Sequence, residues 1–268
     1  MISEKEKAET NKQSYVGITD LVSIVMPAYN CAEYIAETIE SVIKQTYEKW
    51  ELIIVDDNST DNTFSVIKNY MKNSHKIKYY KLNKNSGAAT ARNFALKKCE
   101  GQYIAFLDSD DLWFDTKLEE QLEFLKVNQY TFTCTYYDKV DKYSNKLNYI
   151  IEYPFKVSYQ ELLYNCPGNS TVIYDANAIE EKIHILPIKK RNDYVMWLQV
   201  IKKAKYLNCL EKPLSSHRLR EGSLSNKKID LVKYHWMIYR EIENLSISMS
   251  LKLTTFWIYK TLLNKLKK

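Results

Sequence analysis

The chain has 268 residues, of which 45% are hydrophobic and 27% are charged, and its formal net charge is +6. This length supports one large or two small domains with a substantial core. The lysines are scattered and no dense basic block precedes the C-terminus, so the charge gives little reason to expect nucleic acid binding.

The five cysteines are odd in number and include no C-x-x-C pair, and the four histidines do not pair at metal-ligand spacing. These patterns argue against structural zinc and favour reduced thiols in a cytoplasmic protein. No apolar run approaches the length of a membrane-spanning helix. The charged start of the chain lacks the apolar core of a signal peptide, so we expect residues 1–20 to form a mobile N-terminal tail.

Strands and helices alternate over the first hundred residues. Short β-rich runs are found at 22–26, 51–55, 76–82 and 103–107. Asn30 has Glu33 three positions later, which is capping-box spacing and predicts a helix start, and Gly87 opens another expected helix. This alternation with continuous apolar strands predicts an α/β fold, with a mostly parallel central sheet covered by helices on both faces.

The regular alternation of strands and helices ends in the second half of the chain. We expect a helix over 115–127, a strand leading into a helix over 169–179, an amphipathic helix over 192–204, and C-terminal helices in the last forty residues. No internal repeat or low-complexity linker separates the halves, so they are expected to share one core.

Two acidic clusters directly follow predicted strands. Asp56-Asp57 comes after 51–55, and Asp108-Ser109-Asp110-Asp111 comes after 103–107. In open α/β sheets ligands bind at the carboxyl ends of strands. Carboxylates gathered there need a cation, and oxygen ligands select Mg²⁺ or Mn²⁺, which takes its remaining ligands from phosphate and water. The alternative is that some of these aspartates cap helices, with Asp111 or Asp115 as the candidates.

Glycine-rich phosphate loops are absent from the sequence. Only five glycines occur, and they form neither G-x-G-x-x-G nor a Walker loop. A nucleotide would therefore have to be held by side chains and metal.

The segments "VSIVMPAYNCAEYIAETIESVIKQTYEKWELIIVDDNSTDNT" and "NSGAATARNFALKKCEGQYIAFLDSDDLW" resemble family 2 of the inverting glycosyltransferases, which have the GT-A fold. The resemblance covers about 22–226, and its motifs occur in the family's order. The later segment "NDYVMWLQVIKKAKYLNCLEKPLSSHRLREGSLS" is similar to the branch that makes bacterial surface polysaccharides, including teichuronic acid-type transferases. The resemblance implies a GT-A domain at 21–227, with a nucleotide-sugar-binding half at 21–112 and an acceptor half at 113–227.

The same resemblance implies roles for the residues of the first half. Pro27, Ala28 and Tyr29 would line the nucleoside pocket, and Asp57 would accept the uracil ring N–H. Arg92 in "ARN" would lie near the donor.

The resemblance also assigns the second acidic cluster. Asp108-Ser109-Asp110 matches the D-x-D motif of nucleotide-sugar binding. Asp110 would hold the Mg²⁺ or Mn²⁺ ion, with Asp108 or Asp111 as alternative metal ligands or as contacts to ribose or sugar.

Motifs of the second half carry the remaining implied roles. Asp193 of "NDY" matches the catalytic base, although the family more often has Glu at the position of Asn192. Arg218 and Ser223 match a late pattern of the donor site, in which Arg220 replaces the usual histidine. This departure puts any metal or phosphate role of that histidine in doubt, although an arginine can pair with phosphate.

These observations predict a metal-dependent inverting glycosyltransferase of the hexosyltransferase class. It would move a sugar from a nucleotide-sugar, with UDP expected, to a hydroxyl of a growing glycan or lipid-linked oligosaccharide of the capsule, O-antigen or teichuronic acid type. The first alternative is an inactive nucleotide-sugar-binding subunit. A second is a Mg²⁺-dependent phosphatase, but its D-x-D normally follows the first strand and continues into Thr or Val.

The last segment, 228–268, is expected to be a helical basic extension. "FWIYKTLLNKLKK" mixes Trp257 and three leucines with lysines, a composition found in helices that lie on anionic membranes. The alternative is a terminal helix packed on the domain with a solvated basic face. The first interpretation predicts a cytoplasmic protein that contacts the inner membrane surface.

Overall fold

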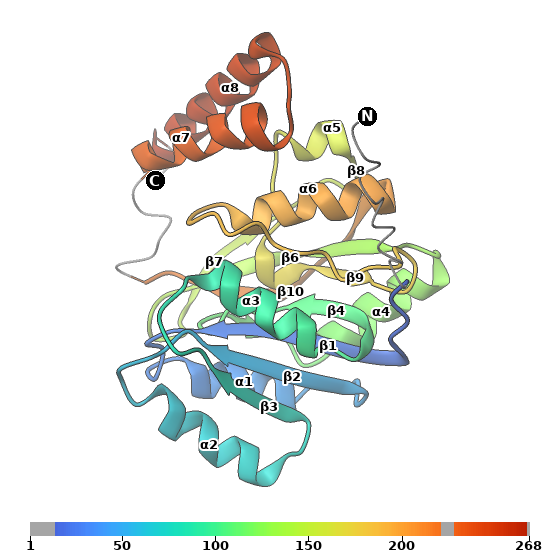
Figure 1. Ribbon diagram of the computed structural model, residues 1–268, viewed down its shortest axis with the longest axis vertical. Coiled ribbons are helices and arrows are strands. Elements are labelled where there is room, and N and C mark those ends of the chain that lie inside the picture. The colour runs from blue at the N-terminus through green and yellow to red at the C-terminus, as the bar shows by residue number, and fades with distance from the viewer. Residues whose placement is uncertain (1–13, 221–227, 267–268) are drawn as a thin grey trace, which may run out of the picture.

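The computed structural model describes residues 14–220 and 228–266, and these residues form one ten-stranded sheet with helices around it (Figure 1). The elements of the first half are β1 (Ile18–Ala28), α1 (Ile35–Ile43), β2 (Trp50–Asp56), α2 (Thr63–Asn73), β3 (Ile77–Lys81), α3 (Ala88–Lys98) and β4 (Gly101–Phe106). Strands β3, β2, β1 and β4 are neighbours in that order and all pair in parallel. The predicted α/β class and the parallel sheet of the first half are confirmed.

The second half extends this sheet with mixed pairing. Its elements are β5 (Leu112–Trp113), α4 (Lys117–Val127), β6 (Phe132–Val140), β7 (Lys146–Ile151), β8 (Lys156–Ser158), α5 (Tyr159–Leu162), a 3₁₀ turn η1 (Asn169–Thr171), β9 (Ile173–Asp175), α6 (Asn192–Ala204) and β10 (Tyr206–Arg218). Strand β9 pairs antiparallel with both β4 and β6, whereas β6 and β10 are parallel. Strand β9 therefore joins the two halves of the sheet.

Two apolar clusters lie on opposite faces of the sheet, because successive strand residues point to opposite sides. On one face, Ile24 and Ile54 pack with residues of α1, α2 and α4. On the other face, Val25 and Ile53 pack with α3 and α6. The predicted inward positions of the 115–127 helix, Leu118, Leu122 and Leu125, are all buried in the first of these clusters.

The chain ends in α7 (Lys228–Met237), a short π-helix η2 (Ile238–Ile242) and α8 (Ile247–Leu266). Helices α7 and α8 form a pair at one end of the molecule, on the α6 side of the sheet (Figure 1). Leu253 of α8 joins the apolar cluster of that face. None of the helices described is both long and apolar enough to cross a membrane.

Several local expectations are corrected by the structure. Helix α1 begins at Ile35, because Asn30 has a φ of 45° and its side chain instead accepts a hydrogen bond from the Thr60 N–H (2.9 Å). Strand β9 runs into a turn and not into a helix, since Glu180 takes a φ of 58°. Thr116, and neither Asp111 nor Asp115, is the N-cap residue of α4.

Residues 14–20, which were expected to belong to a mobile tail, form part of the fold. Strand β1 begins at Ile18, and the Tyr15 hydroxyl donates to the Gly101 carbonyl (2.9 Å). The Tyr15 N–H donates to the Glu180 carbonyl (3.0 Å). Residues 1–13 lie outside the described part of the chain.

Candidate functional site

The carboxyl ends of three parallel strands bring the two acidic clusters to one edge of the sheet. Ala28 of β1 is in register with Asp56 of β2, and Val25 of β1 with Phe106 of β4. The residues that follow these strands therefore lie side by side, as the position of ligand sites in open α/β sheets predicts.

Asp57 is fixed between β1 and the start of α3. Its N–H donates to the Ala28 carbonyl (2.8 Å), and its two carboxylate oxygens accept the N–H groups of Ser86 and Gly87 (2.7 Å each). Gly87 has a φ of 89°, a conformation that favours glycine. Asp57 and Ala28 are buried, whereas Tyr29 is 45% exposed at the rim of this corner.

Asp108 is the first residue of the acidic loop, which comprises residues 108–111. Its Oδ1 accepts hydrogen bonds from Arg92 Nη2 (2.5 Å) and Asn169 Nδ2 (2.9 Å). The N–H of Asp108 donates to Ser170 Oγ (3.1 Å), and that hydroxyl donates to Asp111 Oδ2 (2.5 Å). Asp111 is thus turned into the protein, which leaves Asp108 and Asp110 as the more accessible carboxylates.

Asp110 is a mostly buried carboxylate that pairs with an arginine. Its Oδ2 lies 2.6 Å from Arg220 Nε, and its backbone carbonyl accepts from Arg218 Nε (2.9 Å). Burial, and then the neighbouring charge of Asp111, raise the pKa of Asp110 to about 7 despite the opposing effect of Arg220. Burial and the charge of Asp108 raise the pKa of Asp111 to about 7 as well. The loop therefore concentrates negative charge that a further cation would stabilise.

Asp193 lies in the first turn of α6. Its neighbour Asn192 accepts a hydrogen bond from Arg92 Nη1 (2.8 Å), and the other terminal nitrogen of the same guanidinium holds Asp108. Asp193 itself is half-buried. Arg92 thus joins the start of α6 to the acidic loop.

Among known proteins, a family model described as "Glycosyl transferase family 2" matches residues 23–183. The chain belongs to glycosyl transferase family 2. A Bacillus subtilis (strain 168) protein, assigned by its name to teichuronic acid biosynthesis as the glycosyltransferase TuaG, is 39% identical over 84% of this chain and 89% of its own length. The Escherichia coli UDP-Glc:alpha-D-GlcNAc-diphosphoundecaprenol beta-1,3-glucosyltransferase WfgD is 37% identical over 84% of this chain and 87% of its own length.

Solved structures confirm the GT-A fold of this family 2 glycosyltransferase. Staphylococcus aureus TarS 1–349 in complex with UDP-GlcNAc has a TM-score of 0.71, with 23% identity, over 89% of this chain and 71% of that chain. The mannosyltransferase PcManGT of Pyrobaculum calidifontis, in complex with GDP-Man and Mn²⁺, has a TM-score of 0.66 and 15% identity, over 84% of this chain and 64% of that chain.

The acidic loop of this family 2 enzyme fits a divalent cation by its chemistry. Asp108 and Asp110 offer oxygen atoms alone, which suits Mg²⁺ or Mn²⁺. Burial is the largest cause of the raised pKa of Asp110, and the charge of Arg220 opposes it only in part. Among residues 14–220 and 228–266, no group of three or more His, Cys, Asp or Glu is arranged to hold a metal. Such an ion would need further ligands from phosphate and water.

Arg218 and His217 belong to the late sequence pattern, and both make contacts that the sequence did not predict. Arg218 is buried, and it donates to Glu37 Oε2 (2.6 Å) and to Ser144 Oγ (2.8 Å) as well as to the acidic loop. It therefore ties α1 and the β6–β7 turn to that loop. His217 stacks on Tyr137, with 3.9 Å between the ring centroids, and burial lowers its pKa to about 4. Ser223 lies outside the described residues.

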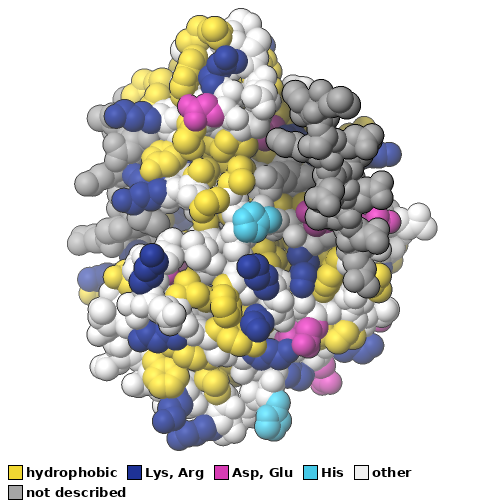
Figure 2. Space-filling model, viewed as in Figure 1, with side chains coloured by type: hydrophobic (Ala, Val, Ile, Leu, Met, Phe, Trp, Pro, Cys, Tyr) yellow, Lys and Arg dark blue, Asp and Glu magenta, His cyan; other side chains and the backbone are white. Residues whose placement is uncertain are grey.

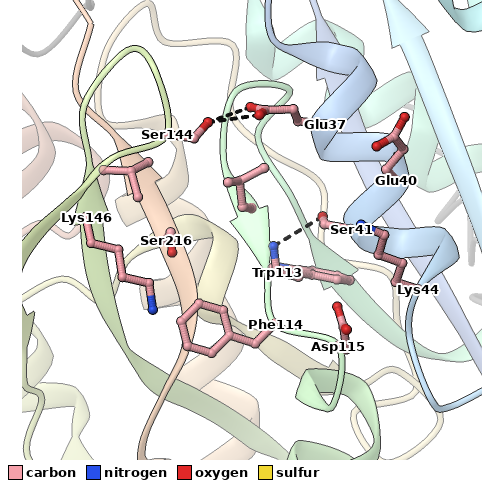
Figure 3. A pocket seen from close by; sticks show the side chains of 12 residues that line it. Glu37, Glu40, Ser41, Lys44, Trp113, Phe114, Asp115, Ser144, Lys146 and Ser216 are labelled. Carbon is pink, nitrogen blue, oxygen red and sulfur yellow. Dashed lines mark hydrogen bonds between the residues drawn. The ribbon is translucent and has the colours of Figure 1, made fainter.

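A cavity of about 300 Å³ lies beside the acidic loop and not over it, between α1, β5, the β6–β7 turn and β10 (Figure 3). Glu37, Phe114 and Lys146 are among its lining residues, but no residue predicted for the site is. The Glu37 carboxylate links the cavity to the acidic loop, because it accepts from Ser144 on one side and from Arg218 on the other.

Sequence reasoning missed two side chains that shape the acidic loop. Asn169 and Ser170 of η1 hold Asp108 and Asp111, and the indole N–H of Trp113 donates to the Ser170 carbonyl (2.7 Å). The one available signal was the chain's single Pro-Gly, at 167–168, directly before these polar residues.

Proposed function

We propose that this glycosyltransferase moves a sugar from a UDP-sugar to a hydroxyl of a growing bacterial surface glycan, with inversion and with Mg²⁺ or Mn²⁺ as cofactor. The observation that carries the proposal is the double hydrogen bonding of Arg92. One guanidinium bonds Asp108 of the D-x-D motif and Asn192, the residue before the implied base Asp193, which supports a shared site for the two.

In this proposal the nucleoside end of the donor binds between β1 and β2. One side of this corner is formed by Pro27, Ala28 and Tyr29, and Asp57 lies at its bottom. Both carboxylate oxygens of Asp57 already accept backbone N–H groups, which fixes the carboxylate in place. Each oxygen keeps a lone pair that can accept the N–H of a uracil ring.

The diphosphate of the donor would lie over the acidic loop. Asp110 would hold the divalent ion, with Asp108 beside it and Ser109 forming the backbone between them. When bound, the ion supplies positive charge to the departing diphosphate. Arg92 keeps the Asp108 carboxylate in one orientation throughout.

Asp193 would act as the general base. Its carboxylate takes the proton of the acceptor hydroxyl, and the hydroxyl oxygen bonds to the anomeric carbon from the face opposite the diphosphate. The bond from that carbon to the diphosphate oxygen breaks in the same step, and its electron pair leaves as the charge of UDP. A single displacement of this kind needs no carboxylate nucleophile, in agreement with one base at the start of α6.

Two observations support a surface-glycan acceptor and contact with a membrane. They are the names of the relatives and the surface of α8. The names of the two relatives refer to teichuronic acid biosynthesis and to a diphosphoundecaprenol-linked sugar. Helix α8 carries lysines and no acidic residue, and several of its apolar side chains are exposed. We therefore place the enzyme in the cytoplasm, in peripheral contact with the inner membrane surface and a lipid-linked acceptor.

The proposal is tested with Asp193→Asn, which keeps the shape of the side chain and removes its basicity. With Mn²⁺, a panel of UDP-sugars and a synthetic GlcNAc-diphospho-lipid, transfer should fall by a factor of about 10²–10⁴, the usual effect of a positioned base. UDP affinity by calorimetry should stay at the wild-type value, because the proposed role of Asp193 is towards the acceptor hydroxyl and not towards the nucleotide. Transfer near the wild-type rate would exclude Asp193 as the base.

A second outcome separates the alternative functions. UDP-sugar binding by the wild-type protein without transfer or hydrolysis of any donor would support an inactive nucleotide-sugar-binding subunit. Hydrolysis of simple phosphate esters with Mg²⁺, together with no UDP binding, would support a phosphatase.

A further inference from the structure

The two aspartates of the D-x-D motif each face an arginine, but the two arginines are held differently. Arg92 is buried, with its side chain 8% exposed, and it bonds both Asp108 and Asn192. Arg220 is 32% exposed and lies two residues after the end of β10. Among the described residues, Arg220 contacts Asp110 Oδ2 (2.6 Å) and lies over the Tyr34 ring (5.7 Å). Arg92 is therefore built into the fold, whereas Arg220 can leave its carboxylate at little structural cost.

Arg220 pairs with Oδ2 of Asp110, one of the two carboxylate oxygens that could bind a divalent ion. Two cations at one carboxylate oxygen repel each other, and this repulsion is strong because the Asp110 side chain is only 15% exposed. An ion that binds Asp110 through this oxygen would therefore displace the guanidinium. A displaced arginine stays within a side-chain length of the loop, and its planar fork matches the oxygen atoms of phosphate.

We propose that Arg220 is an exchangeable counter-ion: it pairs with Asp110 in the free enzyme and moves to the nucleotide diphosphate when a divalent ion takes Asp110. The inference rests on the proposed donor and metal site. It assigns to Arg220 a role in donor binding and makes that role conditional on the metal.

Exchange of this kind couples the two ligands. Without nucleotide, metal binding breaks the Arg220–Asp110 pair and leaves the arginine without a new anionic partner, so the metal alone binds weakly. With UDP present, the released arginine gains phosphate contacts, so each ligand strengthens the binding of the other by the same factor. Couplings in proteins are typically about 5- to 150-fold.

The test measures Mn²⁺ and UDP binding separately by isothermal titration calorimetry, without any turnover. In Arg220→Ala, Mn²⁺ alone should bind more tightly than in the wild type, because its competitor is gone. UDP at saturating Mn²⁺ should bind more weakly, by a factor of about 5 or more. The coupling between the two ligands should fall accordingly. Opposite signs for the two affinities are the signature of exchange, since a merely disturbed site would weaken both.

Two variants control this experiment. Lys72→Ala removes one exposed positive charge on α2, far from the site, and should leave both affinities unchanged. Arg220→Lys keeps the charge and loses the fork, so its Mn²⁺ affinity should stay near the wild-type value while its UDP affinity falls. Circular dichroism melting checks that each variant is folded.

The outcomes separate this inference from the proposed function. If wild-type protein binds UDP with Mn²⁺ and Arg220→Ala changes neither affinity, or weakens both, the counter-ion role is wrong and the proposed donor site stands. If wild-type protein binds no UDP at any Mn²⁺ concentration, the proposed donor site and the exchange are both overturned.

Discussion

Arg92 is the residue on which the site's geometry depends most. Asp108 and Asn192 belong to segments far apart in sequence, and one buried guanidinium bonds both of them (2.5 and 2.8 Å). Its Nε has no hydrogen-bond partner among the described residues, so the two terminal nitrogens hold the side chain. Loss of either partner would leave a buried charged donor unsatisfied, which costs more than the average hydrogen bond.

Asn192→Ala should therefore destabilise the fold and slow catalysis together. The unsatisfied Arg92 Nη1 should lower the free energy of unfolding by about 1–3 kcal/mol, measured by urea denaturation. Arg92 would then be free to reorient Asp108, so transfer should slow as well. Asn73→Ala on the exposed end of α2 is the control, with an expected change within about 0.5 kcal/mol. Equal stability of the two variants would show that Asn192 does not hold Arg92.

Single residues of the site were predictable where the signal is local. The aspartates after the strands at 51–55 and 103–107 could be found because strand ends and acidic clusters are adjacent in sequence. Asn169 and Ser170 could not be found, because only the antiparallel pairing of β9 with β4 brings them to the acidic loop. That pairing is non-local, and the Pro-Gly at 167–168 marks a turn without indicating which strand the next segment joins.

At the scale of elements, the parallel half of the sheet was predictable and the mixed half was not. Each parallel strand is followed by a helix with its own apolar spacing, so the signal repeats. Strand β10 reads "YLNCLEKPLSSHR", and a proline inside a run argues against a strand. The structure accommodates Pro213 because the register with β6 shifts on both sides of it.

Helix α4 carries a lysine in the core beneath the acidic loop. Lys117 is fully buried, its Nζ donates to Gln121 Oε1 (2.7 Å), and it lies 4.3 Å from the centroid of the Trp113 ring. Burial lowers its pKa from 10.5 to about 7. Between these two pH values the unfolded chain binds a proton that the folded protein lacks. Stability therefore rises with pH across that window, by about 1.4 kcal/mol per pH unit for this one group.

Lys117→Met should remove this contribution while conserving most of the side-chain volume. Below about pH 7 both states of the wild type are protonated, so the burial penalty is complete there and disappears towards pH 10.5. Urea denaturation between pH 7 and 9 should give the variant a slope lower by about 1.4 kcal/mol per pH unit. Lys72→Met, at an exposed position, should keep the wild-type slope. Parallel slopes for Lys117→Met and the wild type would contradict a depressed pKa.

At the scale of the whole molecule, the α7–α8 pair gives one end of the enzyme a distinct surface. Figure 2 shows hydrophobic side chains at this end, together with basic side chains and an acidic one. On α8, Leu251, Tyr259 and Leu262 are each more than half exposed, whereas Leu253 and Ser250 are buried against the domain. The sequence of α8 contains three lysines and no aspartate or glutamate. An exposed apolar face on a cationic helix is what an anionic lipid surface would bind.

The membrane proposal is tested on this face without removing the helix. Deleting 252–268 would remove the buried Leu253 and uncover the apolar cluster against which it packs, so the sharper variant replaces Leu251, Tyr259 and Leu262 by serine. Its cosedimentation with vesicles that contain phosphatidylglycerol should fall about tenfold or more, since the apolar area available for insertion is lost. Val127→Ser, at a residue 75% exposed on α4, should bind like the wild type. Binding should also weaken with salt, because the lysines contribute through screened attraction. If the intact protein ignores these vesicles, or the triple variant binds them equally well, α8 is a packed terminal helix and the lipid-linked acceptor must reach the site by another surface.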